Sequence, residues 1–370
     1  MRKHHPKNER IKRRYLSYLE EAKRCQAKTT DQVAAALALF EQSTKWKDFA
    51  AFHIEQAKAF KSQQYDQRNE KTGKPLAKAT VHSRLMHCKA FFLWLAGQPG
   101  YRSKISYSDS DYFNPSANDT RIATAKREKR VPTLEQIKRV LETMPDNSVL
   151  ERRDRAIIAF TLLSGARDDA IASLSVRHVD WNNRRVYQDS RDVRTKNRKT
   201  ITSCFFPVSV DIETMARNWA NELETDHHFG PDDTLFPATE IGLNDNQEFA
   251  PVGISRNQWK NASAIRRIFK RAFTSAGLPY FNPHSFRNTL AQLGERLCTT
   301  PEQFKAWSQN LGHEQVLTTF TSYGQVSNLR QTEILDALGK CKPDGSRGSK
   351  NDTIAEMEAI LQRMKAEKAA

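Results

Sequence analysis

The run AIIAFTLL, within residues 153–163, constrains the fold more than any other part of the sequence. A helix of this composition is apolar on most sides, so it is stable only where other elements surround it. The letters SGAR follow, and we expect Gly165 to end the helix and to release Arg167 at the turn. The sequence therefore predicts a domain built around one central, buried helix.

The residues around this helix predict a mainly helical domain with a small amount of sheet. Thr133 is a good N-cap and Gln136 follows three residues later, which is the capping-box pattern. Further patterned segments are helical stretches starting at 171–174 and covering 211–225 and 257–276, and two strands of a small hairpin at 185–188 and 199–207. We expect an α+β fold, mainly α with a small β-hairpin or sheet, over residues 132–340.

The front half of the chain shows only helical patterns, over residues 28–115. The segments are 31–44 with Thr30 as its cap, 47–61, and 80–97 opened by Thr80. The aromatic run at 91–95 is better explained as core than as a platform for stacking bases. We expect a separate helical domain here.

Two stretches beside this domain are strongly basic. Residues 1–27 are expected to form an N-terminal arm that is helical from about Asn8, and contact with DNA phosphates explains its charge no better than a solvated surface does. Residues 98–131 are expected to be loop, and their last part, 116–131, forms a basic linker at the domain boundary.

The overall charge points to a polyanionic partner. The formal net charge is +16 and the isoelectric point is near 9.6. Nucleic acid is the commonest partner of such basic chains, and the alternative is a basic soluble protein that binds no polyanion.

The five cysteines are far apart, which fits a reducing cytoplasm and no zinc module. No stretch approaches the ~20 apolar residues of a membrane span. We expect a cytoplasmic protein associated with the nucleoid.

The stretch from Phe281 to Gly324 holds the residues with the clearest chemistry. His284 and Arg287 are three apart, a Leu-Gly-His turn ends at His313, and Tyr323 is the last tyrosine of the chain. Proton-carrying and cationic groups followed by a lone tyrosine favour attack on a phosphodiester. Each residue alone is more often structural, so the interpretation depends on the order in which they occur together.

The motifs in this order resemble the tyrosine recombinases, also called phage-type integrases. The matching boxes are Leu162–Arg167, Thr195–Lys199, His284–Arg287, Leu311–His313 and Tyr323. The resemblance covers residues 132–340 as a catalytic domain, and 28–115 is similar to the helical core-binding domain of the family. It implies two domains that form a clamp on duplex DNA.

The resemblance also implies a role for each site residue. Tyr323 would be the nucleophile of a covalent 3′-phosphotyrosyl intermediate, and His284 would handle its proton. Arg167 and Arg287 would clamp the phosphate, with His313 as a third donor. Lys196, or Lys199 as the second choice, would protonate the departing 5′ oxygen. No metal or cofactor is implied, because guanidinium groups supply the positive charge.

The sequence departs from the family pattern in two places. Ala170 stands where the family commonly has a glutamate that supports the first arginine, so Asp168 or Asp169 replaces that support or the support is different. The spacing from His313 to Tyr323 is also one residue longer than usual, and a turn must absorb the extra residue.

The expected function is that of a site-specific DNA recombinase, an integrase that integrates or excises a mobile element such as a phage. Residues 341–370 predict a tethered C-terminal helix with an apolar stripe, expected to dock on a neighbour in a homo-tetramer on two DNA sites. Accessory DNA-bending or directionality proteins are further expected partners. The alternatives are a recombinase that resolves chromosome dimers, an enzyme like type IB topoisomerases, and a DNA-binding regulator of the same fold without catalysis.

Overall fold

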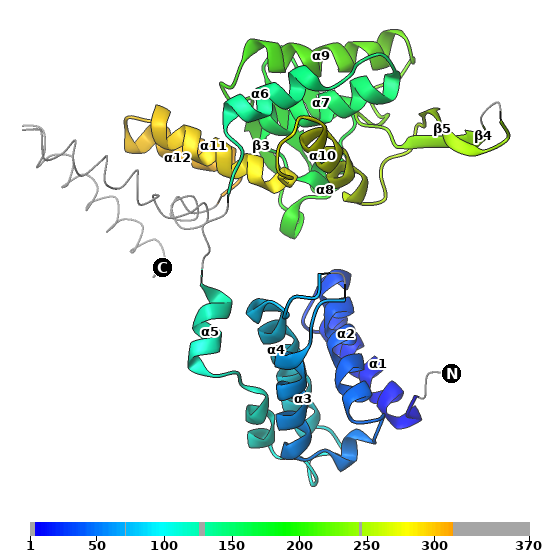
Figure 1. Cartoon of the computed structure of the whole chain (residues 1–370), viewed down its shortest axis with the longest axis vertical. Helices are drawn as coiled ribbons and strands as arrows, with labels where there is room; N and C mark the ends of the chain where they lie inside the picture. Colours follow the sequence, from blue (N-terminus) through cyan, green and yellow to red (C-terminus); the bar gives the residue numbers. More distant parts are fainter. Residues whose placement is uncertain (1–3, 71, 126–129, 244–245, 314–370) are drawn as a thin grey trace, which may run out of the picture. The chain divides into compact units, whose positions relative to one another are not determined.

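The computed structural model describes residues 4–70, 72–125, 130–243 and 246–313, in two compact units, Met1–Arg127 and Glu128–Ala370 (Figure 1). The first unit is helical, and the second combines helices with two small antiparallel sheets, as the predicted fold class requires. Within the described ranges, no helix has the length and apolar character needed to cross a membrane.

Helices that enclose a core of phenylalanine side chains build the first unit. Its elements are α1 (Pro6–Glu21), α2 (Ala27–Ser43), η1 (Phe49–Ala51), α3 (Ile54–Asp66), α4 (Lys78–Ala96), η2 (Tyr107–Phe113) and α5 (Ala117–Thr124). Phe92 on α4 lies 5.1 Å from Phe40 on α2 and 5.3 Å from Phe113 on η2, measured between ring centroids. Phe91 and Phe92 are fully buried, so the prediction that the aromatic run belongs to the core is confirmed.

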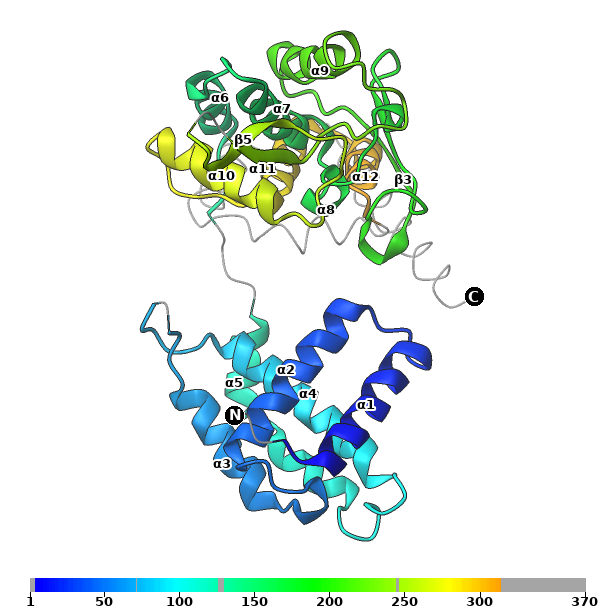
Figure 2. The ribbon, with the colours of Figure 1, turned by 90° about the vertical axis from the view of Figure 1, so that its right-hand side faces the viewer.

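The basic N-terminal stretch contains a helix that packs on the first unit. Helix α1 lies beside α2 (Figure 2) and buries Ile11 and Tyr15 in the core. The Asn8 side chain is fully buried, and it donates to Glu41 Oε1 at 3.0 Å and to the Lys47 carbonyl at 2.9 Å. One face of this helix is therefore fixed by apolar and polar contacts.

Several local predictions for the first unit were wrong. Helix α2 begins at Ala27, so Thr30 lies inside it, where its hydroxyl donates to the Ala27 carbonyl at 2.8 Å instead of capping. Helix α3 begins only at Ile54, because the His53 side chain caps it. Residues 98–131 were predicted to be loop, yet they contain η2 and α5, where Ser116 Oγ accepts from the Asp119 amide at 3.0 Å. Short polar helices with good caps resemble loops in composition.

The second unit contains a longer series of elements. They are α6 (Leu134–Thr143), α7 (Val149–Ser164), α8 (Asp168–Ile171), η3 (Val176–His178), β1 (Val179–Asp180), β2 (Arg185–Gln188), η4 (Lys196–Arg198), β3 (Ile201–Cys204), α9 (Val210–Thr225), β4 (Thr239–Leu243), β5 (Phe249–Ile254), α10 (Ser263–Ser275), α11 (Pro283–Leu297) and α12 (Pro301–Asn310). The first sheet has the order β1-β2-β3, and β4 pairs with β5. The predicted hairpin corresponds to β2 and β3, which pair from Arg185↔Cys204 to Gln188↔Ile201.

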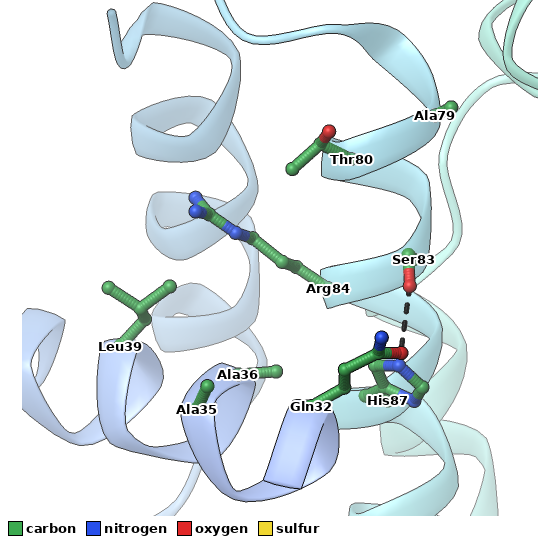
Figure 3. A pocket seen from close by; sticks show the side chains of 9 residues that line it. All are labelled: Gln32, Ala35, Ala36, Leu39, Ala79, Thr80, Ser83, Arg84 and His87. Carbon is green, nitrogen blue, oxygen red and sulfur yellow. Dashed lines mark hydrogen bonds between the residues drawn. The ribbon is translucent and has the colours of Figure 1, made fainter. Parts of the chain in front are cut away.

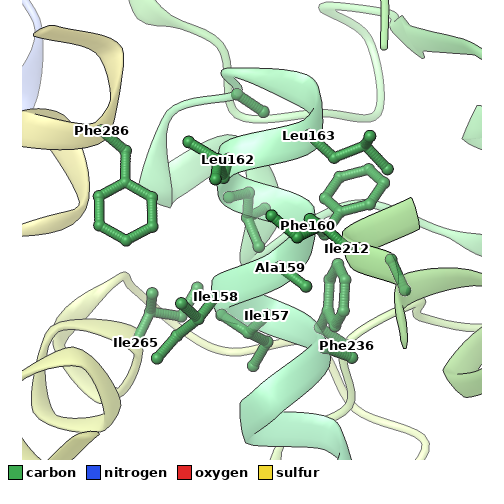
Figure 4. Close-up of a cluster of buried hydrophobic side chains, with 14 of the residues drawn as sticks. Ile157, Ile158, Ala159, Phe160, Leu162, Leu163, Ile212, Phe236, Ile265 and Phe286 are labelled. Carbon is green, nitrogen blue, oxygen red and sulfur yellow. The ribbon is translucent and has the colours of Figure 1, made fainter. Parts of the chain in front are cut away.

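Helix α7 is the central element of the second unit, as the sequence predicted. Its residues from Ala156 to Ser164 are all at most 1% exposed. Figure 4 shows Ile212, Phe236, Ile265 and Phe286 around it, and these come from other parts of the unit. The capping box of Thr133 and Gln136 at the start of α6 is also present.

Two features of the second unit differ from the predictions. Helix α8 ends at Ile171, where the sequence predicted a helix to begin. The β4–β5 hairpin was missed, because Gly242, Pro251 and Gly253 interrupt the strand pattern. Its base is held by the buried Arg153, whose Nη1 donates to Thr239 Oγ1 at 3.1 Å.

Candidate active site

The turn after α7 brings the first arginine box into the interior of the second unit. Gly165 has a left-handed backbone with φ 62° and ends the helix, as predicted. A Cβ added there would lie 2.9 Å from Phe206, 3.2 Å from Leu290 and 3.3 Å from Leu311, so three other segments pack directly on this turn. Arg167 follows as the half-buried N-cap residue of α8.

Arg287, in the middle of α11, bonds to two separate turns. It is 2% exposed, and its guanidinium donates to the carbonyls of Gly165 and Leu311. Its Nη2 also lies 3.2 Å from His313 Nε2. The side chain thereby cross-links the turn before Arg167 and the turn that carries His313.

His313 is half-buried among positive charges, and this keeps its imidazole neutral. Burial, then the charges of Arg287, Arg167 and His284, lower the pKa of His313 to about 4. A guanidinium can only donate, so Nε2 must accept from Arg287 and the single proton of the neutral ring must be on Nδ1. The predicted residues Arg167, His284, Arg287 and His313 are therefore brought together in one site.

His284 differs from Arg287 in its exposure, although one turn of helix separates them. It lies in the first turn of α11, after the N-cap Asn282, whose Oδ1 accepts from the Ser285 amide at 3.1 Å. The His284 side chain is exposed, whereas Arg287 points into the core. The three-residue spacing therefore puts the His284 side chain at the surface and the Arg287 side chain in the interior.

The two candidate lysines lie in the connection between β2 and β3. Lys196 is exposed and opens η4, while Lys199 is half-buried just before β3. Between them Asn197 (φ 60°) and Arg198 (φ 51°) adopt left-handed backbone conformations, which turn the chain sharply.

The end of this connection is fixed against the His313 turn. A Cβ on Gly312 would lie 3.0 Å from the Ile201 side chain, so β3 begins in direct contact with that turn. Asn310 pairs with the backbone of Cys204 in both directions, accepting from its amide at 2.6 Å and donating to its carbonyl at 2.9 Å. This role of Asn310 was not predicted. The only sign of it in the sequence is that a polar side chain stands directly before the Leu-Gly-His turn.

The departure at Ala170 has a structural explanation. Ala170 is 1% exposed and belongs to the core of the second unit, which leaves no space for a solvated acid. Asp168 Oδ2 accepts from Arg266 Nε on α10 at 2.7 Å, so α8 is tied to α10 through this carboxylate. This bond raises the pKa of Arg266.

Part of the predicted machinery lies outside the described residues. This applies to Tyr323, to its spacing from His313 and to the tail at 341–370. Among the residues that are described, no group of three or more His, Cys, Asp or Glu side chains is arranged to hold a metal ion.

The first unit has an open groove between α2 and α4 (Figure 3). It measures about 430 Å³ and is lined by Gln32, Ala35, Ala36, Leu39, Ala79, Thr80, Ser83, Arg84 and His87. Ser83 Oγ lies 3.2 Å from His87 Nε2, and Arg84 Nη1 donates to Gln64 at 2.7 Å and Gln67 at 2.8 Å. The α2 wall is mostly apolar, with Ala35, Ala36 and Leu39, whereas most of the side chains on the α4 wall are polar.

Comparisons with known proteins identify the family and the fold. The model of the phage integrase family matches residues 130–330. Tyrosine recombinase XerC of Corynebacterium glutamicum is 25% identical over 191 residues, 52% of this chain and 51% of that protein, so the match spans about half of the relative's length. A lambda integrase dimer bound to a COC′ core site has a TM-score of 0.58 at 14% identity, covering 88% of this chain and 83% of that one.

A second solved structure shows the same fold. The Tn1549 transposon integrase in complex with transposon right end DNA has a TM-score of 0.55 at 13% identity and covers 89% of this chain and 99% of that one. The family model covers more than half of the sequence, including the boxes that contain Arg167, Arg287 and His313. The chain belongs to the phage integrase family, the tyrosine recombinases.

Proposed function

We propose that the chain is a site-specific DNA recombinase that integrates or excises a mobile element through a covalent 3′-phosphotyrosyl intermediate. The observation that carries this proposal is the 3.2 Å contact of Arg287 Nη2 with His313 Nε2, together with the charges of Arg167 and His284, which act on the same histidine and lower its pKa. Positive charge concentrated beside proton-carrying groups suits a phosphodiester whose non-bridging oxygens gain charge during attack.

In this mechanism the phosphate is bound by fixed donors. Arg167 and Arg287 supply guanidinium groups, whose positive charge and N–H donors suit the non-bridging oxygens of a phosphate. His313 is neutral near pH 7, with its proton on Nδ1, so it acts as a hydrogen-bond donor rather than as a third full charge. Two backbone carbonyls hold the Arg287 side chain in place, so the side chain needs to move little when the phosphate binds.

Two proton transfers complete the reaction. Tyr323 would attack phosphorus, and the exposed His284 would take the phenolic proton, because a phenol of pKa ≈ 10 needs help at neutral pH. Lys196 would give its proton to the departing 5′ oxygen, with Lys199 as the second choice. The phosphotyrosyl bond keeps the energy for rejoining, so the reaction would need no ATP. The guanidinium groups would supply the positive charge that a metal ion supplies in other phosphoryl-transfer sites.

Both units would take part in binding DNA. The net charge of +16 favours contact with phosphates, and the groove between α2 and α4 offers polar side chains in the first unit. We propose a clamp on duplex DNA and a homo-tetramer on two sites, with the tail at 341–370 linking neighbours and accessory proteins setting direction.

Covalent capture tests this proposal and maps the target sequence in the same experiment. Cells that contain the DNA on which the protein acts are lysed in SDS, the protein is captured, and the attached 3′ ends are sequenced. The wild-type protein should carry DNA that ends at defined positions, whereas Tyr323→Phe should carry none and still bind DNA under native conditions. DNA attached to Tyr323→Phe would refute the nucleophile assignment. No attached DNA with the wild type would favour a regulator without catalysis.

A further inference from the structure

We propose that Arg194 is a positioning residue that holds the connection carrying Lys196 against the C-terminal end of α8, the short helix whose N-cap is Arg167. The inference depends on the proposed function, in which Lys196 protonates the departing oxygen. It concerns a residue outside all the sequence boxes, two positions before Lys196 in the connection between β2 and β3.

Arg194 attaches this connection to the end of α8 through both its backbone and its side chain. Its amide donates to Ser173 Oγ at 2.9 Å. Its Nη2 donates to the Trp259 carbonyl at 2.7 Å and to the Ala172 carbonyl at 3.3 Å. One residue therefore spans three segments: the lysine connection, the end of α8 and the residues before α10.

The surface to which Arg194 is attached is rigid. Ser173 is fully buried, and its hydroxyl donates to the Ala170 carbonyl at 3.0 Å while it accepts from Arg194. Gln258 Nε2 donates to the Ser173 carbonyl at 3.1 Å, and the neighbouring Val193 is 2% exposed in the core. Arg194 thus connects the lysine segment to a surface that is fixed by burial and hydrogen bonds.

The other end of the lysine segment is fixed as well. Ile201 packs against Gly312, next to His313, and Asn310 is paired with the backbone of Cys204. The segment at 195–200 is therefore attached at one end to the residues that follow α8 and at the other to the turn of His313. Lys196 is exposed between these two attachments.

Because of these attachments, the backbone position of Lys196, and so the atoms that its side chain can reach, depend on Arg194. A Lys side chain has a flexible four-carbon stem, so the backbone that carries it decides which atoms it can reach. The left-handed residues Asn197 and Arg198 turn the chain directly after Lys196. Without the Arg194 side chain, the upstream end of the segment keeps the amide bond to Ser173 and the buried Val193 but loses both carbonyl contacts, so the segment gains freedom there. The expected consequence is slower proton delivery, with the phosphate clamp of Arg167 and Arg287 unchanged.

A change of leaving group separates this role from general damage to the fold. In cleavage, the Tyr323 oxygen forms a bond to phosphorus and the bond from phosphorus to the 5′ oxygen breaks, with Lys196 donating the proton that makes a 5′ hydroxyl. When sulfur replaces that 5′ oxygen, a thiolate leaves without needing the proton. The substrates are duplexes built around the cleavage position mapped by covalent capture, with oxygen or sulfur at the scissile bond.

Arg194→Ala should slow cleavage of the oxygen duplex about tenfold, which is part of the roughly 10²–10⁴ that a general acid supplies. It should cleave the sulfur duplex within about twofold of the wild-type rate, since no acid is needed there. Arg194→Lys keeps one donor for the Trp259 carbonyl and should be intermediate on oxygen. Arg191→Ala is the matched control, because Arg191 pairs with Asp189 inside the same connection, and it should leave both rates unchanged.

The outcomes separate failure of this inference from failure of the mechanism beneath it. If Lys196→Ala is rescued by sulfur but Arg194→Ala is equally slow on both duplexes, or is as fast as wild type on oxygen, then Arg194 does not position Lys196. If Lys196→Ala is not rescued by sulfur, the general-acid assignment itself is wrong.

Discussion

Arg287 Nη2 lies 3.2 Å from His313 Nε2, and the same guanidinium donates to the Leu311 carbonyl, two residues before that histidine. The arginine and the histidine of the two boxes are therefore parts of one buried network, although 24 residues separate Arg287 from Leu311 in the sequence. A residue proposed to bind the scissile phosphate also contributes to the core. Substitutions at Arg287 are for this reason expected to change stability as well as activity.

The first prediction is that Arg287→Lys destabilises the second unit. A lysine has a single nitrogen, so it cannot satisfy the carbonyls of Gly165 and Leu311 and contact His313 together. Leaving buried acceptors unpaired costs about 1–3 kcal/mol each, so we expect the unfolding free energy to fall by about 3 kcal/mol in urea titrations. Arg267→Lys, on the exposed face of α10, should change it by less than about 0.5 kcal/mol. Equal effects of the two substitutions would contradict the network.

The second prediction concerns the pH dependence caused by His313. Its pKa is about 4 in the folded protein and near 6.5 in an unfolded chain. Between these values the unfolded chain binds a proton that the folded protein does not, so stability falls as the pH decreases from about 6.5 to about 4 and levels off below that. Because the side chain is only half-buried, we expect a contribution of about 1–2 kcal/mol rather than the full shift.

His313→Gln isolates this contribution, because every other titrating group is the same in both proteins. The unfolding free energies at pH 4.5 and pH 7.5, measured in urea, should differ less in the variant than in the wild type, by about 1–2 kcal/mol. Identical pH dependence of the two proteins would mean that the histidine is not held neutral by its cationic neighbours.

Two local features of the second unit were predicted from the sequence. The capping box at Thr133 and the turn at Gly165 were correct, because a cap and a left-handed glycine are decided by neighbouring residues. Contacts between distant segments have no such signal. The attachment of Arg194 to Trp259 and the pairing of Asn310 with Cys204 join residues 65 and 106 positions apart, and no periodicity in the chain indicates them.

In the N-terminal stretch, too, a contact between distant segments could not be predicted from the sequence. Its net positive charge indicated an arm, and the helical spacing of Tyr15 was visible in the sequence. What the sequence lacked was a sign that Asn8 is a buried partner rather than a surface amide. A buried asparagine is identified only by the groups it satisfies, here Glu41, Lys47 and Phe49 from other elements.

The third prediction tests the docking of α1. Asn8→Ala removes the acceptor of the Phe49 amide, at 2.9 Å, together with the donor to the Lys47 carbonyl. Buried groups left without partners cost about 1–3 kcal/mol each, so hydrogen exchange of the Phe49 amide should become about 10- to 100-fold faster, as a loss of ~1.4 kcal/mol per factor of ten requires. Arg13→Ala, at an exposed position of the same helix, should leave that exchange rate unchanged. An unchanged rate in Asn8→Ala would show that apolar contacts alone hold α1.

The fourth prediction compares two glycines that share a left-handed backbone but differ in their surroundings. Gly165 (φ +62°) is packed against Phe206, Leu290 and Leu311, with the nearest atom 2.9 Å from an added Cβ, while Gly277 (φ +69°) has nothing within 4 Å. Alanine carries the same backbone penalty of about 1–2 kcal/mol at both sites, and only at Gly165 does overpacking add about 1–3 kcal/mol. Urea unfolding should therefore show Gly165→Ala as the more destabilised variant by about 2 kcal/mol.

Because the turn leads into Arg167, covalent capture of DNA should also fall in Gly165→Ala and not in Gly277→Ala. Equal losses of stability would mean that the turn can move away from its neighbours, and the close packing would then not be what fixes Arg167.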